Sequence, residues 1–376
     1  MKLFSDAKSR SDDQAAQRQK KSASQQLVII SPRRDVLSEI ASVLLMHNLK
    51  NVVKHEGDFF SLQDDSVTRD AIAVIVDIAD SHDVELITDT AILLIPAGVR
   101  PIFIGNNDSI AFSQALMRTG ASYLHFGSQL PQLAALVQVQ DSLPINRTTM
   151  KISVLGCKGG AGATTVSYHL FQSIGMLTSL PSLLVQGGSG SNDLDLLMAR
   201  ALPKKGSIAA VSANQSVRIE ALDGMWNYED TQFNHYNLVI FDHPIHAQPA
   251  ERLETVIAQS HTIVLVITRD LSTLRMAKNI LDEYKRIMLT RPARELRIVV
   301  CLNEIHPVHA DELRNDDIEE YLGCRILCVN PYKIKNSNTS VDSALYRFAA
   351  YLLGKPLAAL PRKKIVNLTR LFRRQA

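Results

Sequence analysis

The sequence predicts an α/β protein of two domains, each built on a mainly parallel sheet covered by helices. Short runs rich in Val, Ile and Leu alternate with stretches of helical spacing along most of the 376 residues, which is the pattern of parallel sheets. The length is about twice that of a usual single domain. Hydrophobic residues make up 46% of the chain, which is enough for two cores.

The first domain is expected over residues 26–141. It follows a segment, 1–25, that is rich in Ser, Gln, Lys and Asp and has almost nothing to bury, so we expect a disordered tail there. Strands are predicted at Leu27–Ile30, Ala71–Ile78, Pro101–Ile104 and Tyr123–Phe126. Helices are predicted at Asp35–His47, in a stretch after Ile78, and at Ile110–Thr119 and Leu130–Val139.

The second domain is expected over residues 151–360, after a polar, Pro-containing linker at 142–150. Its predicted strands are Ile152–Leu155, Ser182–Val185, Leu238–Phe241, Thr262–Ile267, Arg297–Leu302 and Arg325–Val329. A helix is predicted at Val341–Leu353, and a basic tail follows at 361–376.

Composition and charge exclude several classes of protein. The net charge of +3 does not indicate nucleic-acid binding by itself. Cys324 and Cys328 are four apart, but no second cysteine pair joins them, so neither a cysteine metal site nor a disulfide framework is expected. The N-terminal residues lack the apolar core of a signal peptide, and no run of about 18 apolar residues occurs. We therefore expect a cytoplasmic protein that can touch a membrane but does not cross one.

A glycine-rich turn follows the first strand of the second domain. The residues 158–165 have the sequence KGGAGATT and lead into a helical pattern. Backbone N–H groups in such a turn and at the helix N-terminus bind phosphate, and glycine permits the close approach. The hydroxyl of Thr164 is placed to reach a phosphate-bound Mg²⁺.

This segment resembles the deviant Walker A motif of the MinD/ParA ATPases, KGGxGKTT. The resemblance implies that Lys158 crosses to the nucleotide of a partner in a sandwich dimer. Asp242, at the end of an apolar strand, is similar to the Walker B aspartate that holds the Mg²⁺ sphere, and Asn303 matches an adenine-contacting asparagine. The resemblance thus implies binding of ATP and Mg²⁺, with Thr164 and Asp242 at the metal. The implied nucleotide-binding residues are Lys158, Gly159, Gly160, Gly162, Thr164, Thr165, Asp242 and Asn303.

Two departures from the family pattern concern the chemistry. Ala163 stands where the family has its phosphate-binding lysine, and Gln186 and Gly188 stand where it has the two aspartates that orient the attacking water. A neutral amide cannot act as a base at neutral pH. We therefore assign no catalytic residue and expect nucleotide binding with very slow turnover or none.

The first domain resembles a CheY-like receiver in the order and length of its elements. Asp77 occupies the place of the phosphorylated aspartate. The acidic pair expected after the first strand is replaced by Ser31-Pro-Arg-Arg34, and Tyr123–Gly127 lacks the expected lysine. Without a Mg²⁺ site, Asp77 is expected to be a strand-end cap, and the domain an interaction module.

The tail Pro361–Ala376 contains no acidic residue. At helical spacing its apolar residues share one arc and its Arg and Lys residues lie largely opposite, which is typical of a short helix on an anionic membrane. A terminal helix packed on the domain is the alternative.

The combination of these domains resembles the TadZ/CpaE family of pilus assembly proteins. The resemblance implies a localisation scaffold for the Tad (Flp) pilus and secretion machinery. Such a protein forms homodimers and lies at a cell pole, in peripheral contact with the inner membrane. Two alternatives remain open: a slow ATPase that cycles on the membrane like MinD, and a DNA-associated partition protein like ParA. No nucleic-acid partner is expected.

Overall fold

The computed structural model describes residues 26–138, 148–187, 193–203, 205–220, 227–243, 250–290, 296–332 and 343–355. The predictions for the tail 1–25, most of the linker, Gly188 and Pro361–Ala376 concern residues outside these ranges. Within the described ranges, no helix combines the length and apolarity needed to cross a bilayer.

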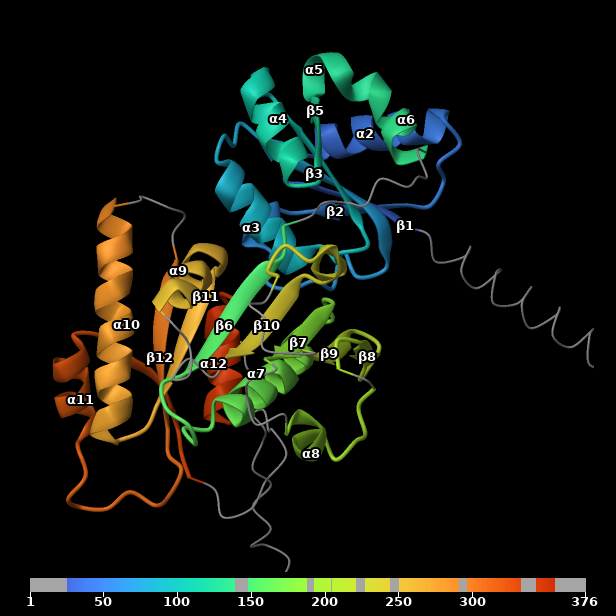
Figure 1. Cartoon of the computed structure of the whole chain (residues 1–376). Coiled ribbons are helices and arrows are strands. Elements are labelled where there is room, and N and C mark those ends of the chain that lie inside the picture. The colour runs from blue at the N-terminus through green and yellow to red at the C-terminus, as the bar shows by residue number, and fades with distance from the viewer. Residues whose placement is uncertain are drawn as a thin grey trace, which may run out of the picture.

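Residues 26–125 contribute a five-stranded parallel sheet in the order β2-β1-β3-β4-β5. Its strands are β1 (Gln26–Ser31), β2 (Val52–Glu56), β3 (Ala71–Ala79), β4 (Arg100–Gly105) and β5 (Ser122–His125). Its helices and 3₁₀ turns are α2 (Arg34–Met46), η1 (Phe59–Ser61), α3 (Val84–Leu94), α4 (Ile110–Arg118), α5 (Phe126–Gln129), η2 (Leu130–Gln132) and α6 (Leu133–Gln138). Helices α2 and α6 pack on one face of the sheet, and α3 and α4 on the other (Figure 1).

Residues 150–330 contribute an eight-stranded sheet in the order β13-β12-β11-β6-β10-β7-β9-β8, parallel except for β8. Its strands are β6 (Met150–Gly156), β7 (Ser182–Gln186), β8 (Ile208–Ala210), β9 (Gln215–Ile219), β10 (Leu238–His243), β11 (Thr262–Ile267), β12 (Arg297–Asn303) and β13 (Ile326–Asn330). Its helices and 3₁₀ turn are α7 (Ala163–Leu177), α8 (Leu194–Met198), η3 (Thr231–His235), α9 (Ala250–Gln259), α10 (Leu271–Thr290), α11 (Asn315–Leu322) and α12 (Ala344–Leu352). Helices α7 and α12 cover one face, and α9, α10 and α11 cover the other.

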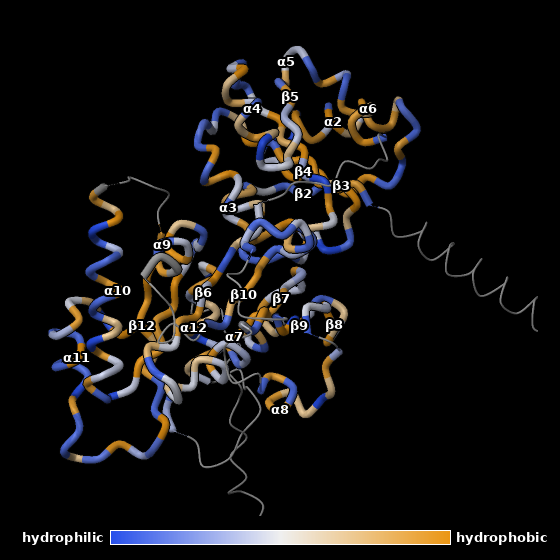
Figure 2. Tube along the Cα trace, viewed as in Figure 1, coloured by the Kyte–Doolittle hydropathy of each residue, from blue (hydrophilic) through white to orange (hydrophobic). Residues whose placement is uncertain are grey.

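Burial explains why the central strands are continuous apolar runs. All six residues of β11 are buried, because helices cover both faces of the sheet there. Apolar residues gather on the inner strands of both sheets in Figure 2. The predicted strands are therefore confirmed to within about two residues at their ends.

Three strands were missed and one predicted helix needs correction. Three strands, β2, β8 and β9, were not predicted, and each lies at or next to an edge of a sheet where side chains are only partly buried. The single helix expected at Leu130–Val139 is a 3₁₀ turn followed by α6, because the N–H of Leu133 donates to the carbonyl of Leu130 three residues before it.

Buried polar side chains join the two sheet units. Asn237, at the start of β10, donates from Nδ2 to the carbonyls of Ile92 and Ile95, at 2.7 Å each, and accepts from the backbone N–H of Ala97 at 2.7 Å. Asn237 is only 1% exposed. It caps the C-terminus of α3, where Pro96 has no N–H to offer the carbonyl of Ile92.

A second contact places a carboxylate of the first unit against α7. Asp65, 1% exposed, accepts hydrogen bonds from the hydroxyl of Thr178 at 3.1 Å and from the backbone N–H and hydroxyl of Ser179. The two units are therefore joined by directional hydrogen bonds, which fix how α3 lies against the second unit (Figure 1).

Candidate functional site

The glycine-rich loop connects β6 to α7 at the carboxyl edge of the second sheet. In the sheet, β10 and β7 lie on one side of β6, and β11 and β12 lie on the other. The order of the strands therefore reverses at β6. Ligands of open α/β sheets bind at such a reversal, outside the carboxyl ends of the strands. Asp242 and Asn303 end parallel strands at the same edge, so the structure brings these two predicted residues to the loop.

Two glycines of the loop have left-handed backbone conformations, with φ of +82° at Gly160 and +81° at Gly162. Gly162 is the N-cap of α7. A Cβ on Gly162 would lie 2.3 Å from Nδ2 of Asn303, whereas a Cβ on Gly160 would meet nothing within 4 Å. Glycine is therefore the residue that fits at position 162, where the chain turns into the N-terminus of α7 close to Asn303.

Asp242, at the end of β10, is 4% exposed and lies beside α7. Its Oδ1 accepts from the Ser167 hydroxyl at 3.2 Å, and the Thr164 hydroxyl also bonds to this carboxylate. Burial raises the pKa of Asp242 to about 6, and the charge of Asp193 adds to this effect, while the hydrogen bonds oppose it. Within the part of the chain that the structure describes, no Lys, Arg or His forms an ion pair with Asp242. A buried carboxylate beside two hydroxyls is a donor set that suits Mg²⁺.

Ionisation of Asp242 should lower the free energy of unfolding of the ligand-free protein as the pH rises from about 4 to about 6. The folded-state pKa of about 6 lies above the ordinary value of 3.8, so the folded state holds more protons than the unfolded chain between these pH values. The loss amounts to about 3 kcal/mol over this window. Asp242→Asn, which cannot ionise, should lack it.

We would measure urea unfolding of the wild type and of Asp242→Asn at several pH values, without Mg²⁺. The difference between the two proteins isolates Asp242, because the other titrating groups are shared. The variant should gain stability relative to the wild type between pH 4 and 7. A difference that does not change with pH would contradict a raised pKa at Asp242.

Ala163 begins α7, where the family motif has lysine. Its methyl group packs closely against the end of β6, since a Cβ on Gly156 would approach it to 2.9 Å. Ala163 and Thr164 are half-buried. An alanine here provides no charge, so a phosphate at this loop would have to be bound by the backbone N–H groups and the dipole of α7.

Gln186, at the end of β7, is 1% exposed and faces α8. Its Oε1 accepts from the backbone N–H of Leu194 at 3.3 Å, and its Nε2 donates to Asp193 at 3.2 Å. The amide also bonds to Asp242. These bonds use both ends of the amide, which contributes no base to the site.

Lys158 forms an ion pair with Asp270 of the same chain. Both side chains are about half exposed, and Asp270 precedes α10 and also bonds to the N–H and hydroxyl of Ser272. The hydrogen bond from Lys158, followed by those from Ser272, lowers the pKa of Asp270 to about 2. Exposed pairs contribute less than about 1 kcal/mol, so Lys158 can leave Asp270 at little cost.

Asn303 holds the loop in place. Its Nδ2 donates to the carbonyl of Ala161 at 2.9 Å, and its Oδ1 accepts from Asn330 at 2.7 Å. The side chain is 6% exposed and both ends of the amide are engaged. Its contact with adenine remains a prediction, and the structure adds a role in positioning the loop.

A cavity of about 380 Å³ lies on the side of the loop that faces α10 and the segment after β12. Its wall consists of Lys158, Gly159, Gly160, Ala161, Thr268, Arg269, Asp270, Thr273, Ile305, His306 and Glu312. Of the predicted residues, Lys158, Gly159 and Gly160 line it, whereas Thr164, Thr165 and Asp242 do not. Thr165 is half-buried on α7.

Asp77 of the first sheet is neutralised by a neighbouring arginine. Arg33 forms two hydrogen bonds to its carboxylate, at 2.7 and 2.9 Å, and the Ser31 hydroxyl donates to it at 2.5 Å. Burial acts to raise the pKa of Asp77, but the bonds from Arg33 and Ser31 outweigh it and lower the pKa. The guanidinium thus lies against the carboxylate that a receiver would use with Mg²⁺, which supports a structural role for Asp77.

Three residues whose side chains contact the predicted site residues were not identified from the sequence. Asp270 follows β11 and precedes an amphipathic helix, so the signal of a helix N-cap was present. Ser167 lies one helical turn after Thr164 and shares its face of α7. Asp193 precedes α8, but no spacing pattern relates it to Gln186.

No family model and no curated protein matches the chain. Solved structures resemble about half of it. The ParA family ATPase from Chlorobium tepidum TLS is 14% identical, with a TM-score of 0.45 over 55% of this chain and 98% of that one. The septum site-determining protein MinD with Mg-ADP from Pyrococcus horikoshii OT3 is 16% identical, with a TM-score of 0.42 over 57% and 100%. A variant of McdA from Cyanothece in complex with ATP is 10% identical, with a TM-score of 0.44 over 55% and 97%.

Proposed function

We propose that the chain binds a nucleoside triphosphate with Mg²⁺ at the loop between β6 and α7, and hydrolyses it very slowly or not at all. The observation that carries this proposal is the left-handed Gly162 at the N-terminus of α7, beside the contact between Asp242 and Thr164. The first feature suits a phosphate, and the second suits a hard cation bound to it.

Slow turnover follows from what the loop lacks. Phosphoryl transfer depends on charges and on a positioned water. Losing the lysine at Ala163 and a carboxylate at Gln186 costs roughly 10²–10⁴ in rate for each group, by analogy with other preorganised groups. Ground-state binding loses less, because the backbone N–H groups, Thr164 and Asp242 remain.

The biological role that we propose is a localisation scaffold for Tad (Flp) pilus biogenesis. It rests on the sequence resemblance to TadZ/CpaE proteins. In this role two copies dimerise through the nucleotide face, with Lys158 leaving Asp270 to reach the nucleotide of the partner. The tail Pro361–Ala376 contacts the inner membrane, and the dimer recruits the pilus machinery at a cell pole.

In this proposal the first unit keeps the fold of a receiver and binds other proteins, and Asp77 is not phosphorylated. Its strand order, 2-1-3-4-5, is the flavodoxin-like order that receivers also have. The pairing of Asp77 with Arg33 supports an interaction module.

Restoring the lysine tests the nucleotide site. Ala163→Lys should bind a fluorescent ATP analogue with Mg²⁺ about 10–100-fold more tightly than the wild type, because a charged hydrogen bond to phosphate contributes about 1.5–3 kcal/mol. Ala163→Met is the matched control, since it adds a similar length without charge. Hydrolysis should stay below detection in all three proteins, because Gln186 is unchanged.

Equal affinities in the lysine and methionine variants would contradict a phosphate at this helix N-terminus. Hydrolysis by the wild type that is lost in Asp242→Asn would instead favour the slow ATPase. Salt-dependent DNA binding would favour the partition protein. For the scaffold, polar foci that persist after disruption of the face around Lys158 would count against dimerisation through that face.

A further inference from the structure

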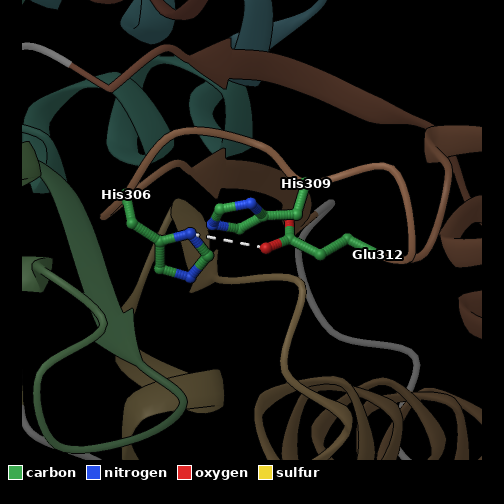
Figure 3. A group of neighbouring side chains, drawn as sticks. All are labelled: His306, His309 and Glu312. Carbon is green, nitrogen blue, oxygen red and sulfur yellow. Dashed lines mark ion pairs between the residues drawn. The ribbon is translucent and has the colours of Figure 1, made fainter.

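The segment between β12 and α11 brings two histidines and a glutamate together outside the predicted magnesium site. The ligand atoms of His306, His309 and Glu312 all lie within 4.8 Å of one another. Figure 3 shows the carboxylate of Glu312 turned toward His306, with the imidazole of His309 beside them. His306 and His309 are exposed, and Glu312 is partly buried.

The separation between His306 and Glu312 suits one shared metal ion. Metal–ligand bonds of about 2.0–2.1 Å in a tetrahedral zinc site place neighbouring ligand atoms about 3.3 Å apart. Nδ1 of His306 lies 3.4 Å from Oε1 of Glu312 and 3.1 Å from the carbonyl oxygen of Pro307, so a metal bound at Nδ1 would replace the contact with Pro307. The N–H of Glu312 donates to the carbonyl of His309 at 3.2 Å. This turn holds His309 and Glu312 close together.

Arg269 holds the segment between β12 and α11 in place through hydrogen bonds. It is buried to about nine-tenths and donates to Glu304, to the carbonyl of Leu313 and to Asn315. Its Nε lies 3.7 Å from Oε2 of Glu312, too far for a hydrogen bond. Within the described residues, this buried oxygen has no hydrogen-bond donor. The bonds of Arg269 thus fix the chain on both sides of the three side chains, and among the residues described Oε2 of Glu312 is left without a donor.

We propose that His306, His309 and Glu312 bind a first-row transition-metal dication of the zinc class. Two imidazoles and a carboxylate favour this class over Mg²⁺ or Ca²⁺, which take oxygen ligands. His306 and Glu312 also line the cavity that contains Lys158. Three protein ligands leave a fourth position for water or for an anionic oxygen in this cavity.

This site is distinct from Thr164 and Asp242 and does not depend on the proposed nucleotide. The alternative to a metal site is an ion pair between a protonated His306 and Glu312. The two differ in what they require, because an ion pair has no need of His309. Substitution of His309 therefore separates them.

The test is a titration of untagged, full-length, chelator-treated protein with Zn²⁺ by calorimetry and with Co²⁺ by visible absorption. One equivalent should bind per chain. Bound Co²⁺ should show visible ligand-field bands without thiolate-to-cobalt charge transfer, since no cysteine takes part. His309→Ala and Glu312→Gln should each weaken binding by more than about 100-fold, beyond the roughly 10–100-fold effect of outer contacts.

His47→Ala is the control, because His47 is exposed at the end of α2, far along the chain from this segment. It should bind Zn²⁺ like the wild type. Zn²⁺ should also raise the unfolding temperature of the wild type and of His47→Ala, but not that of His309→Ala. No binding by the wild type, equal binding by His309→Ala, or a thiolate charge-transfer band would each overturn the proposal.

Discussion

Replacing Asn237 by alanine should lower the free energy of unfolding by about 3–6 kcal/mol. The substitution leaves the carbonyls of Ile92 and Ile95 and the N–H of Ala97 without their partner, and all three residues are buried. Each buried unsatisfied group costs about 1–3 kcal/mol. A domain is stable by only about 5–15 kcal/mol, so this is a large share.

Chemical denaturation followed by circular dichroism measures this change. The control is Asn106→Ala, because Asn106 is exposed and donates only to exposed Asp80 from its side chain. It should change the stability by less than about 0.5 kcal/mol. The Asn237 variant should also unfold less cooperatively, because the two sheet units lose a connection. Similar stabilities of the two variants would show that Asn237 does not join the units.

The second large effect concerns the loop. Gly162→Ala should cost about 2–5 kcal/mol, of which about 1–2 come from an alanine in a left-handed conformation. The rest follows because the new Cβ would lie 2.3 Å from Nδ2 of Asn303 and displace that amide from Ala161 and Asn330. Affinity for a Mg²⁺–ATP analogue should fall with it, since the loop loses its shape.

Gly160→Ala is the matched control for the same loop. Gly160 has nearly the same φ, +82° against +81°, but its Cβ would meet nothing within 4 Å. It should therefore cost only the conformational part, about 1–2 kcal/mol. Unfolding of both variants, with calorimetric titration of the analogue, separates the steric effect from the backbone effect. If both variants lost equal stability, Asn303 would not be the residue that restricts position 162.

Most of both sheets was predictable because their strands are buried on both faces. The run Thr262–Ile267 is short and rich in β-branched residues, and these two features indicate a buried strand rather than a buried helix. The missed strands β2 and β9 have polar and apolar residues in no clear alternation. The pairing of β2 with β1 and of β9 with β7 joins segments distant in the sequence, which local patterns do not contain.

The site was predictable where a single segment determines it. The glycines, Thr164 and Asp242 follow strands, and the order of the sheet brings the strand ends together. The pairing of Lys158 with Asp270 joins residues 112 positions apart, and no motif specifies it. Asn237 looked like an ordinary residue before an apolar strand, because its partners in and after α3 lie on another unit. His306, His309 and Glu312 follow no metal-binding spacing that a sequence pattern would single out, and the fold of the segment after β12 brings them together.

The cap on α3 also has a consequence for synthesis on the ribosome. The first sheet is complete when residue 138 has emerged, but the end of α3 must wait for Asn237, about 100 residues later. At roughly 5–20 residues per second, this interval lasts about 5–20 s. During it, the carbonyls of Ile92 and Ile95 lack the amide of Asn237, whereas those of Ala91 and Leu94 already have partners within the first unit. The nascent first unit should therefore present a frayed helix end to chaperones until β10 is translated.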